Sequence, residues 1–230
     1  ILRLGFLLAV SLVVSAVLDA LSSWSGGAAA VGEAIDFVAS LVILTALMRT
    51  GQIAPFYIFI TYILTYGTQV LGFSRGLLLN LVMLGAAASL IATPILGYLS
   101  DIIGRRKLIM IGGLVMVFFP FAYFALIDTR VIWLVALAIV LSEPVDDIQY
   151  APQAAFIAET FPGSRRYSGT SLGFQLASLT AGGPAPIIAL YLFETYKTST
   201  AVAAYMSLSA VVSLAALWSM RDHAGSLDQH

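Results

Sequence analysis

The sequence predicts an all-α, polytopic membrane protein whose main part is a bundle of six helices. The chain of 230 residues is 60% hydrophobic and only 10% charged, and its mean hydropathy is +0.97. Soluble domains carry roughly 25% charged residues, so this chain has too few charges to cover a globule. The charges also fall in clusters, which leaves uncharged stretches at 50–74, 76–100, 108–127, 167–193 and 198–220. Each is long enough for the ~20 apolar residues with which a helix crosses a bilayer.

Several other classes of protein are excluded. A membrane barrel needs alternating polarity in ~10-residue strands, which these long apolar stretches lack. A net charge of −1 argues against nucleic acid as a partner. The sequence has no cysteine, no metal-ligand spacing, no phosphate-binding glycine loop beside a lysine and no G-x-S-x-G. We therefore expect no disulfide, no enzymatic activity, no cofactor and no metal.

The first 42 residues form a segment of uncertain status. The apolar run "LGFLLAVSLVVSAVL" (4–18) follows a single basic residue, Arg3. This run is consistent with a signal-peptide core, a short span or the tail of a truncated helix. The stretch "SSWSGGAAAVGE" after it is typical of a loop. Because the chain begins with Ile1 and not with Met, we expect it to be a fragment of a longer protein.

The region from residue 43 to residue 220 contains the predicted bundle. The apolar stretches and the short connections between them predict six spans, near 43–72, 76–99, 108–127, 131–157, 167–192 and 199–220. The connections are as short as "GFSRG", "SDIIGRRK" and "DTR". Residues 221–230 form a polar tail.

The basic residues predict the orientation, because cytoplasmic loops carry an excess of Lys and Arg. If the first span runs outward, six basic residues collect on one side: Arg105, Arg106, Lys107, Arg165, Arg166 and Arg221. Three collect on the other side: Arg75, Arg130 and Lys197. We therefore expect a multi-pass protein of the plasma membrane with a cytoplasmic C-terminus.

One connection carries more detail than an anchor requires. In "GYLSDIIGRRK" (97–107), Asp101 is expected to accept hydrogen bonds from the free backbone N–H groups at the start of the next helix. Gly104 permits a sharp turn, and Gly97 lets a neighbouring helix come close. Arg105 and Arg106, with the lysine that follows them, hold the connection at the lipid headgroups. A simple topology anchor is the alternative interpretation.

Arg49 is the only charge between residues 37 and 74. If its helix begins near residue 43, it lies about two turns inside the membrane. An ionisable group at that depth is a functional candidate. Its guanidinium would bind a substrate carboxylate through two parallel hydrogen bonds. The alternative is that Arg49 reaches back to the cytoplasmic headgroups.

The segment "SEPVDDIQYAPQ" (142–153) interrupts a predicted span with polar groups. On a helix, Glu143, Asp146, Asp147 and Tyr150 share one face. Three carboxylates so close together cannot comfortably all ionise, so we expect at least one to hold a proton near neutral pH. Of the three, Asp147 is the preferred proton site. In the alternative interpretation the span ends early and the acids are solvated in a loop.

The segment "GTSLGFQLASLTAGGPAPIIA" (169–189) has small residues at every fourth position, at Gly169, Gly173, Ala177 and Ala181. This repeat lets helices pack closely or slide. The run 182–186, with its two glycines and two prolines, is expected to interrupt the helix near the middle of the membrane. Gln175 is expected either to line a polar path through the bundle or to hold two helices together. Glu159 in "AETFPGSRRYSG" is expected to pair with Arg165 or Arg166.

The pattern G-x-x-x-D-x-x-G-R-R between two spans resembles the signature loop of the major facilitator superfamily. In that family the loop lies between helices 2 and 3 and again between helices 8 and 9. Its aspartate pairs with an arginine and a helix end across a domain seam, and the link breaks as the transporter changes face. The resemblance implies a conformational latch made by Gly97, Asp101, Gly104, Arg105 and Arg106.

A second block resembles a narrower group. "YAPQAAFIAETFPGSRRYSGTSLGFQLAS" and "PFYIFITYILTYGTQVLG" look like helices 10–11 and helix 7 of the metabolite:proton symporters. That group carries shikimate, 2-oxoglutarate, citrate, proline or betaine across the bacterial inner membrane. Asp147, Tyr150 and Gln153 fit its pattern, whereas Glu143 and Asp146 are additional acids. The resemblance covers residues 44–220, the C-terminal six-helix half.

The resemblance implies secondary active transport of a small organic acid or zwitterion by alternating access, coupled to proton symport. Its partners would be the substrate, a proton, the lipid bilayer and an N-terminal half that is missing from this sequence. Proton-independent uniport or exchange is a variant of this hypothesis. A different function remains open, that of a non-transporting membrane remnant or scaffold that oligomerises through the small-residue helix faces.

Overall fold

The structure is a computed structural model, and it describes residues 29–161 and 166–220. The chain divides into a unit of residues Ile1–Leu41 and a larger unit of residues Val42–His230. The predicted bundle belongs to the larger unit. The predictions for residues 1–28, for Arg165, for the side chain of Arg166 and for the tail 221–230 fall outside the described residues.

The described part of the chain is almost entirely helical and contains no strand. Its elements are α2 (Ala29–Tyr57), the π-helical turn η1 (Ile58–Tyr62), α3 (Ile63–Gln69), α4 (Arg75–Ile103), α5 (Arg105–Asp128), α6 (Ile132–Thr160), α7 (Arg166–Ala177), the π-helical turn η3 (Ser178–Gly182), α8 (Ala185–Tyr196) and α9 (Ser199–Ser219). The prediction of an all-α fold is confirmed.

Five helical stretches in the described residues are long and apolar enough to cross a membrane: Val38–Gln69, Arg75–Ile103, Arg105–Asp128, Tyr167–Tyr196 and Ser199–Ser219. The sixth, α6, has 29 residues, which is ample length for a span. It differs from the others because three carboxylates lie near its middle. The predicted polytopic membrane protein is therefore confirmed, with α6 as its polar member.

The first helix of the bundle begins earlier than the sequence suggests. It was expected near residue 43, but α2 starts at Ala29. The alanines of "GGAAAVGE" have the highest helix propensity of all residues, which explains why this stretch is helical at its end instead of a loop. Arg49 consequently lies deep in a continuous helix, and not two turns from its start.

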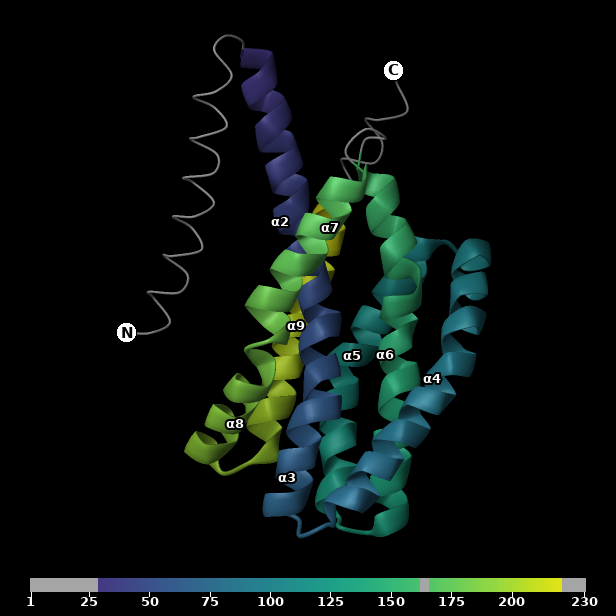
Figure 1. Ribbon diagram of the computed structural model, residues 1–230, viewed down its shortest axis with the longest axis vertical. Coiled ribbons are helices and arrows are strands. Elements are labelled where there is room, and N and C mark those ends of the chain that lie inside the picture. Colours follow the sequence, from purple (N-terminus) through teal and green to yellow (C-terminus); the bar gives the residue numbers. More distant parts are fainter. Residues whose placement is uncertain (1–28, 162–165, 221–230) are drawn as a thin grey trace. The chain divides into compact units, whose positions relative to one another are not determined.

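The helices of the larger unit pack around α6 and α9. α6 lies between α4 and α5, and α5 also packs along α9. α8 packs against α9 and against η1. Figure 1 shows the connections α3–α4, α5–α6 and α8–α9 at one end of the bundle, whereas α4 and α5 meet at the other end.

Small residues hold α2 against its neighbours. A Cβ atom added to Gly51 would come within 2.5 Å of Ser213 in α9, and one added to Gly173 in α7 would come within 2.5 Å of Thr45. Ala177 and Ala181 are buried on the same face as Gly173. Such contacts let backbones approach closely and fix the position of α2 between α7 and α9.

Two π-helical turns interrupt the long helices. The turn η3 is followed by Gly183 and Pro184, and α8 starts at Ala185, so the helix is interrupted in the run 182–186. The other turn, η1, joins α2 to α3 without a break in the helical path. Proline gives no direct cause for it, because Pro55 lies before the turn. π-Helical turns occur frequently at functional sites.

The end of the bundle near α3 is tied together by Asp128, which the sequence did not single out. The hydroxyl of Tyr66 in α3 donates to Asp128 Oδ1 at 2.6 Å. The hydroxyl of Ser199 in α9 donates to Asp128 Oδ2 at 2.5 Å. One carboxylate at the end of α5 therefore links three helices.

Candidate functional site

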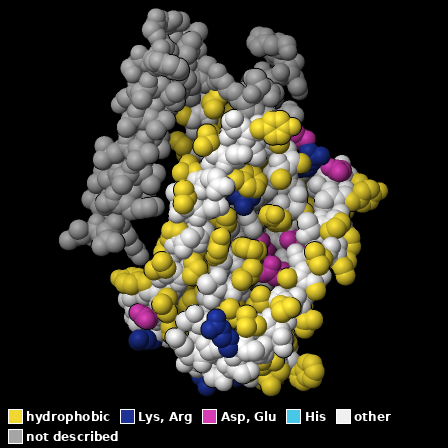
Figure 2. Space-filling model, in the orientation of Figure 1, with side chains coloured by type: hydrophobic (Ala, Val, Ile, Leu, Met, Phe, Trp, Pro, Cys, Tyr) yellow, Lys and Arg dark blue, Asp and Glu magenta, His cyan; other side chains and the backbone are white. Residues whose placement is uncertain are grey.

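A polar pocket of about 300 Å³ lies between α2, α4 and α6. Its lining residues are Arg49, Gln52, Ile53, Phe56 and Tyr57 from α2, Ser89 from α4, and Glu143, Asp146, Asp147 and Tyr150 from α6. Figure 2 shows acidic side chains gathered in a hollow in the middle of this face, with a basic side chain close by and further acidic and basic side chains toward both ends. The volume of the pocket is at the lower end of the range for small-molecule sites.

The three acids of α6 lie inside the bundle. α6 runs unbroken through residues 143–147, and the exposed fractions of Glu143, Asp146 and Asp147 are 8%, 3% and 5%. The spacing of three and four residues places them on one face, together with Tyr150, as a helix requires. The alternative in which these acids are solvated in a loop is wrong.

Each acid has a different environment. Gln52 of α2 donates from Nε2 to Asp146 Oδ2 at 2.6 Å. The Ser89 hydroxyl of α4 donates to Asp147 Oδ2. The carboxylate of Glu143 makes no hydrogen bond within the described part of the chain, and its stem packs against Gly85 of α4. Neighbouring helices therefore hold Asp146 and Asp147 from opposite sides, while Glu143 is left to the pocket.

Arg49 is buried at 5% exposure and faces the acids across the pocket. Its Nη1 donates to Gln153 Oε1 at 3.1 Å. Its guanidinium carbon lies 3.8 Å from the centre of the Phe174 ring in α7, a cation–π contact. The alternative in which Arg49 extends to the headgroups does not fit a guanidinium held between α6 and α7.

Several buried polar atoms around the pocket have no hydrogen-bond partner among the described residues. They are Arg49 Nε, Gln52 Oε1, Asp146 Oδ1 and Gln153 Nε2. A buried polar group without a partner costs about 1–3 kcal/mol. Four such atoms on two facing helices indicate a site that is completed by a ligand or by water.

The expected site residue Gln175 is not brought to the pocket. Its neighbours Gly173 and Ala177 face the bundle. Gln175 lies two residues from each of them, about 200° around the helix, and is exposed. The helical period explains why its side chain points away from α2.

Gln52, Ser89 and Phe174 belong to the site but were missed in the sequence. Gln52 had a signal, because it follows Arg49 by three residues and so shares its face. Ser89 and Phe174 had none, since only the packing of α4 and α7 brings them to the acids.

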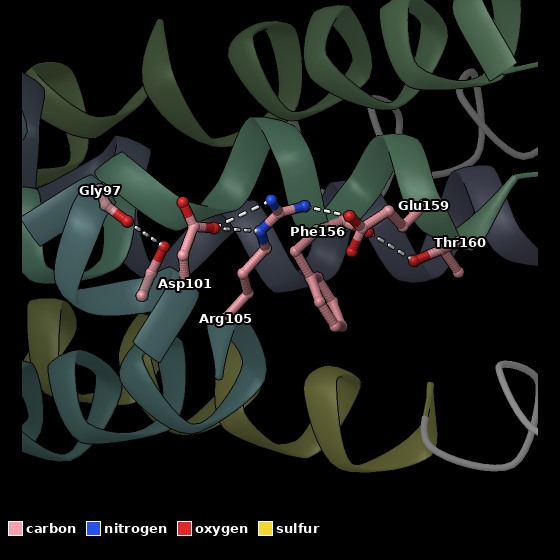
Figure 3. Close-up of polar contacts among 7 residues, drawn as sticks. Gly97, Asp101, Arg105, Phe156, Glu159 and Thr160 are labelled. Atoms are coloured by element: carbon pink, nitrogen blue, oxygen red, sulfur yellow. Dashed lines mark hydrogen bonds and ion pairs between the residues drawn. The ribbon is translucent and has the colours of Figure 1, made fainter. Parts of the chain in front are cut away.

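The connection between α4 and α5 forms a separate charged cluster, shown in Figure 3. Arg105 contacts Asp101 Oδ1 through Nη2 at 3.0 Å and through Nε at 3.2 Å. The same guanidinium donates from Nη1 to Glu159 in the last turn of α6. Gly104 has φ +104°, a conformation that side chains rarely adopt. The cluster therefore joins α4, α5 and α6 around one sharp turn.

Three details of this connection differ from expectation. Asp101 lies in the last turn of α4, and its side chain bonds Arg105 instead of the backbone at the start of α5. Glu159 pairs with Arg105, which the sequence did not suggest, while Arg165 and the side chain of Arg166 lie outside the described residues. A Cβ atom on Gly97 would meet nothing within 4 Å, so no described helix packs closely there. Arg106 donates to the Leu217 carbonyl at the end of α9, at 3.1 Å.

Comparison with known families decides the wider identity of the chain. Residues 87–229 match the family model described as Major Facilitator Superfamily. The chain belongs to the Major Facilitator Superfamily. The match includes the α4–α5 connection and the acids of α6, whereas Arg49 and Gln52 lie before it.

Curated members of the superfamily resemble the chain over most of its length. The shikimate transporter of Escherichia coli (strain K12) is 30% identical over 76% of this chain and 40% of its own length. The inner membrane metabolite transport protein YhjE of the same strain is 29% identical, over 77% of this chain and 41% of its own length. The glycine betaine/proline/ectoine/pipecolic acid transporter OusA of Dickeya dadantii (strain 3937) is 28% identical, over 76% and 34%.

The chain spans about two fifths or less of each of these superfamily members. Their names agree with the predicted group of metabolite carriers, and the expectation that the chain is not an enzyme agrees with membership of this superfamily. No solved structure matches the chain closely enough to count as a relative.

Proposed function

We propose that this chain is the C-terminal half of a secondary transporter for a small organic acid or zwitterion, coupled to protons. One observation carries the proposal: a pocket in which a single buried arginine faces three buried carboxyl groups. The half would pair with an N-terminal half to close the pocket, and movement of the two halves would open it alternately to each side of the membrane.

Arg49 is the proposed contact for the carboxylate of the cargo. Its guanidinium is stacked on Phe174, which fixes the plane of the fork and limits the entropy lost on binding. Nη1 is engaged by the neutral amide of Gln153 while Nε has no partner in the described residues. A cargo carboxylate would accept from Nε and from Nη2 on the same edge of the guanidinium, in charge-assisted hydrogen bonds that are about twice as strong as neutral ones.

The charge balance of the pocket supports proton coupling. One guanidinium faces three carboxyl groups, so the pocket would carry excess negative charge if all were ionised. A low-dielectric site resists such an excess, and an anionic cargo would increase it. Binding of the cargo and binding of a proton would therefore favour each other, which is the linkage that symport requires. We assign the transported proton to the group of Glu143, Asp146 and Asp147, with Asp147 as the first residue to test.

The cluster of Asp101, Arg105 and Glu159 is the proposed conformational latch. Its side chains are partly exposed, with fractions of 30% for Arg105 and about 60% for each acid. Exposed ion pairs stabilise by at most about 1 kcal/mol, so this one can break and re-form during a transport cycle. Gly97, which faces open space, is available to a helix of the other half.

Proteoliposomes test the proposed function. One sample would hold this chain alone and another the protein from the full reading frame that encodes it, each with labelled shikimate, citrate, proline and betaine. We expect accumulation driven by an inward proton gradient from the full-frame protein. If neither inserted, folded sample accumulates any compound, the non-transporting scaffold becomes the better hypothesis. Gradient-independent uptake would instead remove the proton coupling and leave the transport.

A further inference from the structure

A second pocket lies at the end of the bundle where α3 joins α4. It has a volume of about 260 Å³, and its lining residues are Thr61, Leu64, Thr65, Thr68, Gln69 and Arg75. It therefore combines one cation with three hydroxyls and an amide, and its lining contains no acid. This composition is complementary to a carboxylate.

The polar groups of this pocket are available to a ligand. Arg75 is exposed and makes no hydrogen bond or ion pair within the described part of the chain. The same holds for the hydroxyls of Thr61 and Thr65. The Thr68 hydroxyl donates to the Leu64 carbonyl at 2.7 Å, which leaves its oxygen as an acceptor. Arg75 and two free hydroxyl donors thus share one cavity.

The π-helical turn η1 places the residues that line this pocket on the same face of the helix as the residues of α2 that line the first pocket. The residues of α2 that line the first pocket continue along a regular helix to positions 60, 63, 64 and 67, at 3.6 residues per turn. Those positions are Ile60, Ile63, Leu64 and Gly67, and Ile63 and Gly67 are buried in the bundle. A π-helical turn inserts about one extra residue. The face consequently continues at Thr61, Leu64, Thr65 and Thr68.

One face therefore runs along α2, η1 and α3 from Arg49 to Thr68, with apolar residues such as Phe56 and Leu64 among its polar ones, and Arg75 at the start of α4 stands at its far end. Its length from Arg49 to Thr68 is about 28 Å at 1.5 Å per residue, close to the ~30 Å thickness of the hydrocarbon core. A guanidinium stands at each end, and threonine hydroxyls lie between the outer guanidinium and the first pocket. The extra residue in η1 is what makes this face continuous.

We propose that the α3–α4 pocket is an outer loading site for the cargo. Arg75 would bind the carboxylate of the cargo there, before the cargo moves to Arg49 along the face that bears Thr61, Thr65 and Thr68. The inference rests on the proposed function, since it assumes that a carboxylate is carried. It adds a second site, on the opposite end of the bundle from the Asp101 cluster. The cargo carboxylate would be the ligand of the Arg75 guanidinium and of the Thr61 and Thr65 hydroxyls.

Uptake kinetics of the full-frame protein test the loading site. The cargo would be whichever of labelled shikimate or citrate the unmodified protein accumulates, measured in phosphatidylcholine vesicles at low salt. Arg75→Gln is expected to raise the half-saturation concentration about fivefold, the effect of one partly exposed charge pair, with the maximal rate unchanged. Arg75→Lys should recover most of the loss, and salt should shrink the difference.

Arg130→Gln is the matched control. Arg130 is also exposed, lies in the α5–α6 connection at the same end of the bundle, and makes no side-chain bond in the described residues. It does not line the pocket, so its substitution should leave the half-saturation concentration unchanged. Equal effects of the two substitutions would show a general surface potential and overturn the loading site.

Two further outcomes would also overturn it. A loss of maximal rate in Arg75→Gln with unchanged half-saturation would make Arg75 structural. A difference that appears only in vesicles with phosphatidylglycerol would make lipid phosphate, and not the cargo, the ligand of Arg75. Failure of the unmodified protein to accumulate either acid is a separate result, because it contradicts the proposed function before any variant is compared.

Discussion

At the scale of single residues, Arg49 is where shape matters as much as charge. Arg49→Lys keeps the positive charge but removes the planar fork that Phe174 and Gln153 hold. We expect the half-saturation concentration for a carboxylate cargo to rise about tenfold, because roughly one charge-assisted hydrogen bond is lost. Uptake kinetics of the full-frame protein check this. An unchanged value would place the carboxylate contact elsewhere.

Asp147 separates proton coupling from movement of the cargo. Asp147→Asn keeps the shape and an acceptor oxygen for the Ser89 hydroxyl but removes the titratable group. We expect gradient-driven accumulation to be lost while exchange of labelled for unlabelled cargo continues. The control is Glu194→Gln, the same chemical change at an exposed position of α8, which should alter neither. Intact accumulation in Asp147→Asn would transfer the proton to Glu143 or Asp146.

Only part of this residue-level picture was accessible from the sequence. The spacing of Glu143, Asp146 and Asp147 predicted a shared face because a helix repeats every 3.6 residues. Which neighbour holds each acid could not be predicted, because Gln52 and Ser89 reach them through the packing of α2 and α4. The absence of Gln175 from the pocket could not be predicted for the same reason, since its face is set by the contact between Gly173 and Thr45.

At the scale of elements, the turn between α4 and α5 depends on Gly104. At φ +104° a side chain would strain the backbone by about 1–3 kcal/mol. Gly104→Ala should therefore lower the midpoint of thermal unfolding of the chain in detergent. Gly76→Ala is the matched control, because a Cβ atom there meets nothing within 4 Å. A Gly104→Ala variant as stable as Gly76→Ala would show that the turn readily adopts another form.

The spans themselves were the most predictable elements, because uncharged runs of ~20 residues have few alternatives. The π-helical turns were not predictable. In η1 the sequence "IFITY" contains no proline or glycine, so the local sequence does not predict a π-helical turn. The early start of α2 was obscured because its small residues suit both a loop and a helix.

At the scale of the whole molecule, the basic residues predict which end of the bundle faces the cytoplasm. The chain has no cysteine, so a single introduced cysteine is a unique label within it. In intact cells, an impermeant maleimide should label the Arg130→Cys variant at once. It should label the Lys107→Cys variant only after the membrane is permeabilised. The full-frame protein without either substitution controls for other thiols. The reverse pattern would invert the proposed orientation.

The π-helical turn η1 also bears on how such a carrier can change its specificity. If residues 58–62 formed regular α-helix with the same number of residues, the remainder of that segment would rotate by about 100°. Thr61, Thr65 and Thr68 would leave the face that Arg49 begins, although none of them had been replaced. A substitution within 58–62 that straightened this turn would thus change the lining of both pockets without replacing any residue that lines them.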